Sequence, residues 1–557
     1  MVGPLVRRWN HPDGDREDVG GRGGYGEAVI RRRVLALLGA CSLAALVACS
    51  GTESGVSVND ARAVDAADST DATSSTAPPA SETPESSETS EIPETSEIPE
   101  TPETPDTSEP DDGGPSAGTG DGIGDELYPD LGNPGVDVVD YELDLSYDPA
   151  DEVIEGTVTL RIRFTDDRDG FTLDASGPDV SAVTIDGEAV DFALDDPELR
   201  ITPAEPIDEG DTHTVAVTYR VVPGGASSLS GLPSGWFTTD TGSYVLNEPD
   251  GARTWLPSND HPSDKATWTY RITVPAGLSA IANGRLVGTT SGPDGDTWEW
   301  REDEPMPTYL MLVLTGPYTV VEDTSAGGVE LISVALTDEI EQARPFFDGI
   351  DEQIEFFEER FGPYPLDRYG LAITDSFGGL AMETQGRSLF SRDDMRDPEG
   401  YVEQLLLSHE LAHQWFGNAV SPARWRDIWL NESFATYLQW MWLEHIGFTT
   451  VEQEAEFALA NRQDGAGDPT GDPGADQLFS YNSYDGGAVV LHALRLTIGD
   501  DAFFEALRTW AQDHEGQSLT TDDFVDHVED VAGRSLDTLF DTWLYADRLP
   551  STYPTAA

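Results

Sequence analysis

A long stretch of Ser, Thr, Glu and Pro limits where this chain of 557 residues can build a hydrophobic core. From Ser50 to about Gly124 the sequence repeats short units such as SETPESSETSEIPETSEIPE. Apolar residues are too few there to offset the entropy lost on ordering, and proline and like charges favour an extended chain. We therefore expect a disordered linker over 50–124, with the folded domains confined to the sequence that follows.

A short hydrophobic segment precedes this linker. Three arginines at 31–33 are followed by about fifteen mostly apolar residues that end just before Cys49. This segment is too short for a comfortable transmembrane helix. The sequence LVAC at 46–49 resembles a bacterial lipobox, in which the cysteine carries the lipid. We expect residues 1–49 to contain an N-terminal extension and a lipoprotein signal peptide. The protein would be exported and lipid-anchored on the outer face of the bacterial cytoplasmic membrane, or secreted.

The charge balance excludes one class of partner. The formal net charge is −74, and Lys265 is the only lysine. Binding of nucleic acid needs cationic side chains that neutralise phosphates, so we expect no nucleic-acid partner. No obligate protein partner is evident either. Both cysteines, Cys41 and Cys49, precede the linker, so no disulfide is expected in the folded part.

Two patterns divide the remaining chain. Residues 125–327 alternate apolar and polar side chains between Gly, Pro and Asp, as antiparallel strands do. The clearest expected strands are 139–148, 156–164, 213–222 and 266–274. Residues 328–557 show mostly helical spacing, with one buried strand expected within 369–379. The sequence predicts a multi-domain α+β protein, in which an N-terminal antiparallel β domain precedes a mostly helical domain.

The sequence LSHELAHQWFGN at 407–418 carries the strongest chemical signal. We expect a helix that begins after Pro398 and ends near Gly417. His409 and His413 fall on a stripe of apolar residues with i, i+3 and i+4 spacing, so both imidazoles share a buried face. Two imidazoles one turn apart can bind a single metal ion. The alternative is a core helix with two hydrogen-bonded histidines.

A second helix, expected over about 427–447, supplies a third ligand. Glu432 lies among Trp, Leu and Phe, where a carboxylate is costly unless it is paired or bound to a metal. Two imidazoles and one carboxylate leave a fourth position for water, as in catalytic zinc sites. We therefore expect one Zn²⁺ per chain, with Glu410 as the general base. A salt-bridged Glu432 is the alternative, and Asn431 and Asp427 either support the ligands or serve as capping and surface residues.

With these residues the chain resembles the aminopeptidase N family of zinc metallopeptidases, within the gluzincin group. The resemblance rests on HELAHQWFGN followed by NESFATY, and NEPDGARTWLPSNDHPSDKATW, IANGRLV and PTYLMLVLTGPY are similar to segments of the family's β domain. It covers about residues 126–557. It implies that 328–557 is a thermolysin-like zinc metallopeptidase catalytic domain, which hydrolyses N-terminal residues from peptides.

The resemblance implies further site residues. Tyr484 in YNSYDGGAVV matches the tyrosine that stabilises the oxyanion, although Gly486 replaces the family's usual basic residue and Tyr481 is a rival. Glu383 in GGLAMETQ matches a glutamate that binds the free α-amine of the substrate. Glu248 in NEPDGAR matches a second amine-binding glutamate; the alternative is a solvated glutamate in a turn. The expected partners are therefore peptides with a free N-terminus.

The resemblance also implies that the segment GGLAMETQ lines the pocket for the first side chain of the substrate. Ala381 and Met382 match the family pattern, whereas Leu380 and Thr384 depart from it, as does Leu246, where many relatives have glutamine. We expect no counterpart of the family's long C-terminal helical domain after residue 557. We therefore expect a less enclosed cleft.

Three functions stay open at this point. The first is a zinc aminopeptidase attached to the membrane through a lipid on Cys49. The second is a zinc endopeptidase of the same fold, which would not need a free amine on its substrate. The third is a catalytically dead, surface-anchored binding protein, although the residues expected for catalysis are all present.

Overall fold

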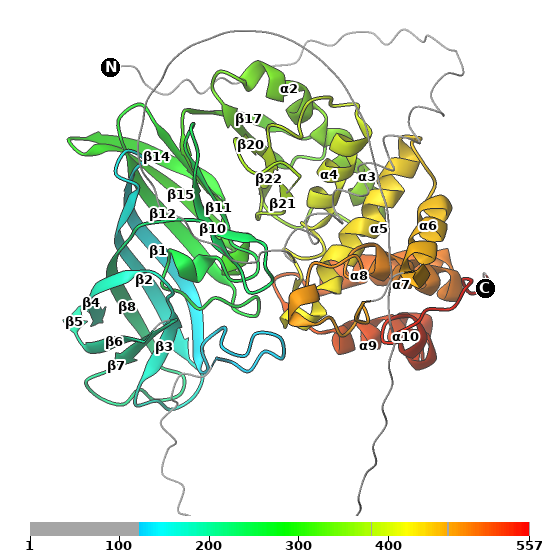
Figure 1. Cartoon of the computed structure of the whole chain (residues 1–557), viewed down its shortest axis with the longest axis horizontal. Coiled ribbons are helices and arrows are strands. Elements are labelled where there is room, and N and C mark those ends of the chain that lie inside the picture. Colours follow the sequence, from blue (N-terminus) through cyan, green and yellow to red (C-terminus); the bar gives the residue numbers. More distant parts are fainter. Residues whose placement is uncertain (1–121, 196, 380, 465–466, 556–557) are drawn as a thin grey trace, which may run out of the picture. The chain divides into compact units, whose positions relative to one another are not determined.

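The computed structural model describes residues 122–195, 197–379, 381–464 and 467–555. The expected signal peptide, its Cys49 and nearly all of the expected linker lie outside the described residues. Among the helices of the described part, none is long and apolar enough to cross a membrane. Figure 1 shows a strand-rich N-terminal domain followed by a smaller sheet and a group of helices. This is the α+β arrangement that the sequence predicts.

An eight-stranded sheet forms the body of the β domain. In spatial order its strands are β14 (Arg285–Gly292), β15 (Gly295–Met306), β12 (Ala266–Val274), β1 (Val136–Asp148), β2 (Val153–Phe164), β8 (Thr212–Val221), β4 (Asp179–Ile185) and β5 (Glu188–Ala189). The expected alternation is clear in β12, where every second residue is buried. Neighbouring strands are antiparallel with one exception, because β1 and β12 run parallel.

Two smaller sheets complete the β domain. One contains β13 (Ser279–Ala282), β16 (Val313–Gly316), β11 (Ser243–Leu246), β10 (Pro233–Thr238) and β9 (Ala226–Ser227). The other contains β3 (Phe171–Asp174), β7 (Glu198–Thr202) and β6 (Asp191–Asp195). The segment between β11 and the short 3-10 helix η2 (Ala252–Thr254) carries Glu248. The β domain therefore delivers one of the expected substrate-binding residues from a loop.

A mixed sheet introduces the second domain. Its strands are β17 (Tyr318–Thr324), β18 (Glu330–Leu336), β20 (Leu371–Thr374), β22 (Ser388–Ser391) and β21 (Ala381–Met382), and β19 (Arg368–Tyr369) pairs with β18. β17 and β18 are antiparallel partners. The domain boundary expected at 327/328 falls between these two strands. β21 is the edge strand of this path, and Glu383 follows it directly.

Helices make up most of the remaining chain. They are α2 (Ile340–Asp348), α3 (Ile350–Phe361), α4 (Tyr401–Ala412), α5 (Trp429–His445), α6 (Val451–Asp464), α7 (Asp485–Ile498), α8 (Asp500–Asp513), α9 (Thr521–Ala532) and α10 (Asp537–Trp543). In Figure 1, α4 lies between β21 and α5, and it contacts both. α5 is buried on every side from Trp429 to Leu443. Polar residues on α5 therefore need partners within the protein.

The β domain meets the second domain at the turn that follows α4. Lys265 Nζ, from the β domain, donates to the carbonyl oxygens of Asn418 at 2.9 Å and Ala419 at 3.1 Å. Tyr309 Oη donates to the carbonyl oxygen of Gly417 at 3.3 Å. These contacts fix the chain immediately after the expected metal-binding helix, so the β domain helps to position the site.

Candidate active site

The two expected histidine ligands lie at the end of α4. This helix ends at Ala412 with His413 as its C-cap, so it is shorter than the sequence suggests. The chain then passes close to α5 at Gly417, where φ is +131°. A Cβ atom there would lie 3.0 Å from Asn431 Oδ1 and 3.2 Å from His413 Nδ1. Glycine therefore meets both the backbone conformation and the close approach.

The histidine rings turn their Nε2 atoms toward Glu432. The distances from Glu432 Oε2 are 3.2 Å to His409 Nε2 and 3.4 Å to His413 Nε2. His413 Nδ1 lies 3.2 Å from the carbonyl oxygen of Phe416, which accepts its proton. An imidazole that donates through Nδ1 keeps the Nε2 lone pair free for a metal. One ligand atom from each of the three residues lies within 4.8 Å of the others, which fits a single zinc ion.

Gln439 completes the support of the first histidine, and sequence reasoning missed it. Gln439 Oε1 lies 2.9 Å from His409 Nδ1. The other ring nitrogen of His409, Nε2, faces Glu432. The residues considered from the sequence lie elsewhere. Asp427 accepts from Thr521 Oγ1 at 2.6 Å, and Asn431 Nδ2 donates to a tyrosine hydroxyl. The only available signal was a polar residue two turns after Glu432, between apolar and aromatic neighbours.

The imidazoles keep Glu432 ionised. Burial alone would raise the pKa of this carboxyl group, but the neighbouring His413 and His409 hold it at about 2. The same carboxylate, together with Glu383, raises the pKa of His413 against the effect of burial. These groups form a charged, mutually paired set. Such a set can exchange its pairing for coordination of a cation.

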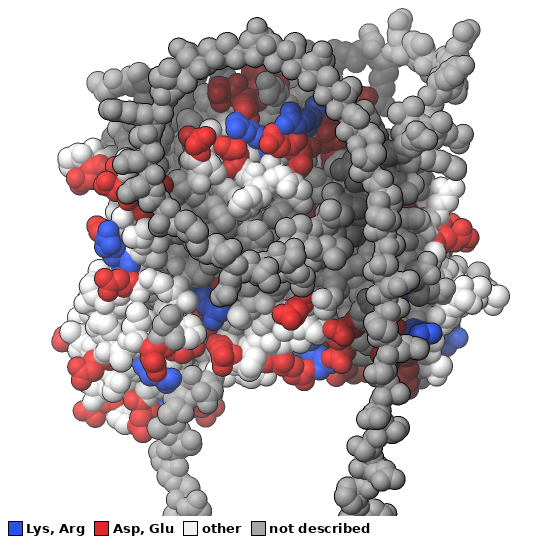
Figure 2. Space-filling view, in the orientation of Figure 1, with Lys and Arg blue, Asp and Glu red and all other residues white. Residues whose placement is uncertain are grey.

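The other carboxylates of the cleft are less well paired. Burial raises the pKa of Glu410, Glu383 and Glu248, and the negative charges around each of them raise it further. Glu383 Oε1 and Glu248 Oε1 are enclosed and have no hydrogen-bond partner among the described residues. The acidic excess continues at the surface, where red side chains outnumber blue ones on the uncovered part of Figure 2. This group of carboxylates therefore suits a positively charged ligand.

Glu383 is held in place through its backbone. Its carbonyl oxygen accepts from Asn418 Nδ2 at 2.7 Å and from Gln414 Nε2 at 3.1 Å. Both donors follow the histidines in sequence, so the turn that carries the metal ligands also fixes the position of Glu383. One carboxylate oxygen of Glu383 lies within 4.8 Å of a carboxylate oxygen of Glu248 and of Glu432. The structure thus brings together two glutamates from different domains beside the expected zinc site.

Tyr484 faces the metal ligands, and Tyr481 does not. The ring of Tyr484 lies 6.0 Å from that of His409, at an interplanar angle of 24°. Burial raises the pKa of its hydroxyl, and Glu432 adds to this effect, so the hydroxyl stays protonated and can donate. The hydroxyl of Tyr481 instead donates to the carbonyl oxygen of Ala458 on α6, at 3.3 Å.

Gly487 brings α7 close to α5, since a Cβ there would lie 1.7 Å from Ser433 Oγ.

The residues expected to line the pocket differ in their burial and contacts. Met382 is buried and Ala381 is half-buried, both in the edge strand β21. Thr384 does not face the pocket through its hydroxyl, because Oγ1 donates to the carbonyl oxygen of Arg387 at 2.5 Å. Leu246 is buried at the end of β11. Leu380 lies outside the described residues.

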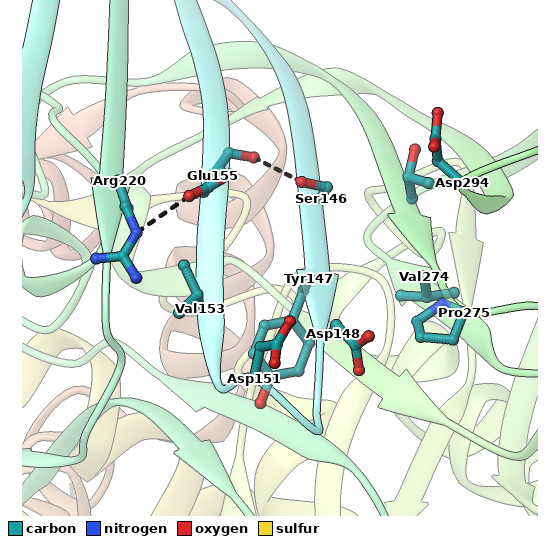
Figure 3. Close-up of a pocket in the computed structure, with 11 residues that line it drawn as sticks. Ser146, Tyr147, Asp148, Asp151, Val153, Glu155, Arg220, Val274, Pro275 and Asp294 are labelled. Atoms are coloured by element: carbon teal, nitrogen blue, oxygen red, sulfur yellow. Dashed lines mark hydrogen bonds and ion pairs between the residues drawn. The ribbon is translucent and has the colours of Figure 1, made fainter.

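A separate hollow lies at one end of the large β sheet (Figure 3). It has a volume of about 450 Å³ and shares no residue with the cleft. Its arginine, Arg220, is already paired with Glu155 at 3.0 Å. Its other charged residues are Asp148, Asp151 and Asp294, which Figure 3 labels. This hollow carries no constellation of catalytic groups.

Comparison with known proteins now adds to this geometry. Residues 347–543 match the model described as the peptidase family M1 domain, and residues 138–310 match the peptidase M1 N-terminal domain. The M1 zinc metallopeptidase from Deinococcus radiodurans superposes with a TM-score of 0.70 at 30% identity, covering 78% of this chain and 100% of that one. The chain belongs to the M1 family of zinc metallopeptidases. Zinc is accordingly the metal that the two histidines and Glu432 would hold.

Two further relatives are longer than this chain. Probable aminopeptidase 2 from Sulfurisphaera tokodaii is 26% identical over 439 residues, which are 75% of this chain and 54% of that protein. Human endoplasmic reticulum aminopeptidase 1 is 27% identical over 362 residues, covering 60% of this chain and 38% of that protein. This M1 metallopeptidase therefore spans about half, or less, of the length of these relatives.

Proposed function

We propose that this M1 metallopeptidase is an aminopeptidase, which hydrolyses the first peptide bond of substrates with a free N-terminus. One observation carries the proposal: Glu248 and Glu383 place carboxylate oxygens within 4.8 Å of the zinc ligand Glu432. A protonated α-amine would pair with these two carboxylates. Because the amine is one residue away from the first peptide bond, this pairing places that bond beside the zinc ligands.

The chain's own groups divide the chemistry between them. His409, His413 and Glu432 would hold the zinc ion, which would supply Lewis-acid chemistry for the water and the peptide carbonyl. A carboxylate oxygen of Glu410 lies within 4.8 Å of a ring nitrogen of His413 and of a carboxylate oxygen of Glu383. Its carboxylate takes a proton from the attacking water and returns it to the departing amine nitrogen. The hydroxyl of Tyr484 donates to the carbonyl oxygen as negative charge develops there.

Descriptions of related proteins support this proposal. The longer relatives from Sulfurisphaera tokodaii and Homo sapiens are described as aminopeptidases. A mutant of the Deinococcus radiodurans M1 protein is described as bound to a Tyr-ser-ala substrate, and it is 30% identical to this chain over 99% of its own length.

The decisive experiment compares one peptide with a free α-amine and with an acetylated one. An aminopeptidase cleaves the first form and leaves the second intact, because the acetylated end cannot pair with Glu248 and Glu383. A chelator should abolish the reaction, and added zinc should restore it. Equal cleavage of both forms, at an internal bond, would favour the endopeptidase. Bound zinc without cleavage of any aminoacyl amide would favour the binding protein.

We also propose that the enzyme is exported and held at the membrane by a lipid on Cys49. The support is the sequence pattern alone, with a basic start, an apolar stretch and LVAC at 46–49. Expression of the full chain and of Cys49→Ser would test it. The unchanged chain should sediment with membranes, and the variant should not.

A further inference from the structure

The cleft holds more negative charge than one zinc ion can offset. Four glutamates lie in three groups whose members each place one potential ligand atom within 4.8 Å of the others: Glu432 with His409 and His413, Glu383 and Glu410 with His413, and Glu248 with Glu383 and Glu432. A single Zn²⁺ balances two of these carboxylates, and the neutral imidazoles add no charge. The other two charges include those of Glu248 and Glu383, each of which keeps an enclosed oxygen without a hydrogen-bond partner among the described residues. Without substrate they need either protons or another cation.

The geometry supplies a second set of ligands. Glu248, Glu383 and Glu432 each place one carboxylate oxygen within 4.8 Å of the others. Glu383 is only 3% exposed, and its Oε1 has no hydrogen-bond partner among the described residues; the same is true of Glu248 Oε1. A carboxylate has two oxygens, so Glu432 can belong to this set and to the histidine set at once. Carboxylates that bridge two metal ions about 3.5–4 Å apart are a recurring arrangement in hydrolases.

We propose that the substrate-free enzyme binds a second divalent cation between Glu248, Glu383 and Glu432, with Glu432 bridging it to the first. Three carboxylates without an imidazole bind more weakly than the histidine set, because imidazole is a stronger ligand for zinc. The second ion therefore binds only when the cation is in excess. It occupies the position of the substrate amine, so ion and substrate exclude each other. This competition rests on the proposed aminopeptidase function, whereas binding of the ion does not.

The first test counts bound zinc and does not use activity. The full chain is dialysed against rising Zn²⁺ at high NaCl concentration, which screens loose binding to the acidic surface. We expect one tight and one weaker zinc per chain. Glu383→Gln and Glu248→Gln should each remove the weaker zinc and keep the tight one. Asp148→Asn, in the acidic hollow of Figure 3, is the matched control and should keep both.

Two outcomes would overturn the second site. One is a single zinc at every concentration, which would mean that protons neutralise Glu248 and Glu383. The other is a second zinc that persists in both glutamine variants, which would place it elsewhere on the acidic protein. Circular dichroism of the variants distinguishes loss of the site from loss of the fold, and the tight zinc provides a second check of folding.

Kinetics then separate this inference from the proposed function. With a free-amine peptide, Zn²⁺ at the dissociation constant of the second site should raise the apparent KM about twofold and leave kcat unchanged. Retention of the second zinc without any rise in KM would confirm the ion site and contradict the amine-binding role of the two glutamates. Inhibition with only one zinc bound would contradict the ion site and leave that role intact.

Discussion

Two groups of carboxylates in this molecule differ in how many hydrogen-bond donors reach their oxygens. In the β domain, Asp174 Oδ2 accepts from Asn133 Nδ2 at 2.7 Å and from the backbone nitrogen of Asp260 at 2.8 Å. Asp260 accepts from the backbone nitrogen of Arg253 and from Thr308 Oγ1. In the cleft, Glu383 and Glu248 each keep an enclosed oxygen without such a donor. The first group stabilises a fold, and the second keeps its acceptors for a ligand.

The difference shows how one residue type can serve structure or chemistry. Backbone N–H groups and fixed side chains satisfy both oxygens of Asp260 and one oxygen of Asp174 as soon as the chain folds, whereas Asp174 Oδ1 has no hydrogen-bond partner among the described residues. The cleft carboxylates gain a full set of partners only when metal and substrate arrive, so their burial costs stability beforehand. If this comparison holds, substitutions in the cleft should change activity more than stability. Substitutions in the β-domain group should do the reverse.

The largest effect is expected for Glu410→Gln. This change removes the general base but keeps the shape of the side chain, so kcat/KM should fall about 10²–10⁴-fold. The zinc ligands are untouched, and zinc should stay at one tight ion per chain by atomic absorption. An aminoacyl-amide assay measures the rate. Loss of the tight zinc would show that Glu410 has a structural role. It would contradict the expectation that substitutions at this site change activity more than stability.

Tyr484→Phe should lower kcat about 10²–10³-fold, because it removes one donor to the developing oxyanion. KM should change much less, since the contact forms only in the transition state. Tyr481→Phe is the matched control: its hydroxyl donates to Ala458 on α6, away from the ligands. Similar losses in the two variants would refute the assignment of Tyr484.

Gln439→Leu should weaken zinc binding about 10–100-fold, as found when the partner of a ligating histidine is removed. The cause is the lost hydrogen bond to His409 Nδ1, which fixes the tautomer and orientation of the ring. Competition with a chelating dye measures the affinity. Gln439→Glu keeps an acceptor at this position and should retain binding. Unchanged affinity in the leucine variant would mean that Glu432 alone orients the ring.

The smallest effect, and the one that tests the other side of the comparison, is a pH dependence of stability. Burial raises the pKa of Asp174 to about 7, above its value in the unfolded chain. The folded state therefore binds a proton that the unfolded state releases. The resulting stability is fully present below the unfolded pKa of about 4 and is lost as pH rises through about 7.

Asp174→Asn should remove this contribution while keeping an acceptor for Asn133 and for the backbone of Asp260. The slope of unfolding free energy against pH between about 4 and 7 should become shallower by at most about 1.4 kcal/mol per pH unit, the limit for one proton. Urea unfolding at several pH values measures the slope. The kcat of the variant should stay close to that of the unchanged enzyme. An unaltered slope would show that Asp174 is ionised in the fold.

Local spacing explains what could be predicted from the sequence. His409 and His413 share a helix face by periodicity alone, and the strand patterns within residues 136–274 recur in the observed strands. Gln439 could not be found this way, because its contact with His409 depends on how α4 packs on α5. The parallel pairing of β1 with β12 is equally hidden, since the two strands are far apart in the sequence. Glu248 was placed beside Glu383 only through family resemblance.

The single lysine makes the junction between the two domains chemically addressable. Lys265 offers the only side-chain amine of the protein, and it is bound to two carbonyl oxygens next to the turn that carries the metal ligands. An acylating reagent or a fluorophore directed at ε-amines would therefore attach at one known place. Its attachment rate would report how often the catalytic turn separates from the β domain.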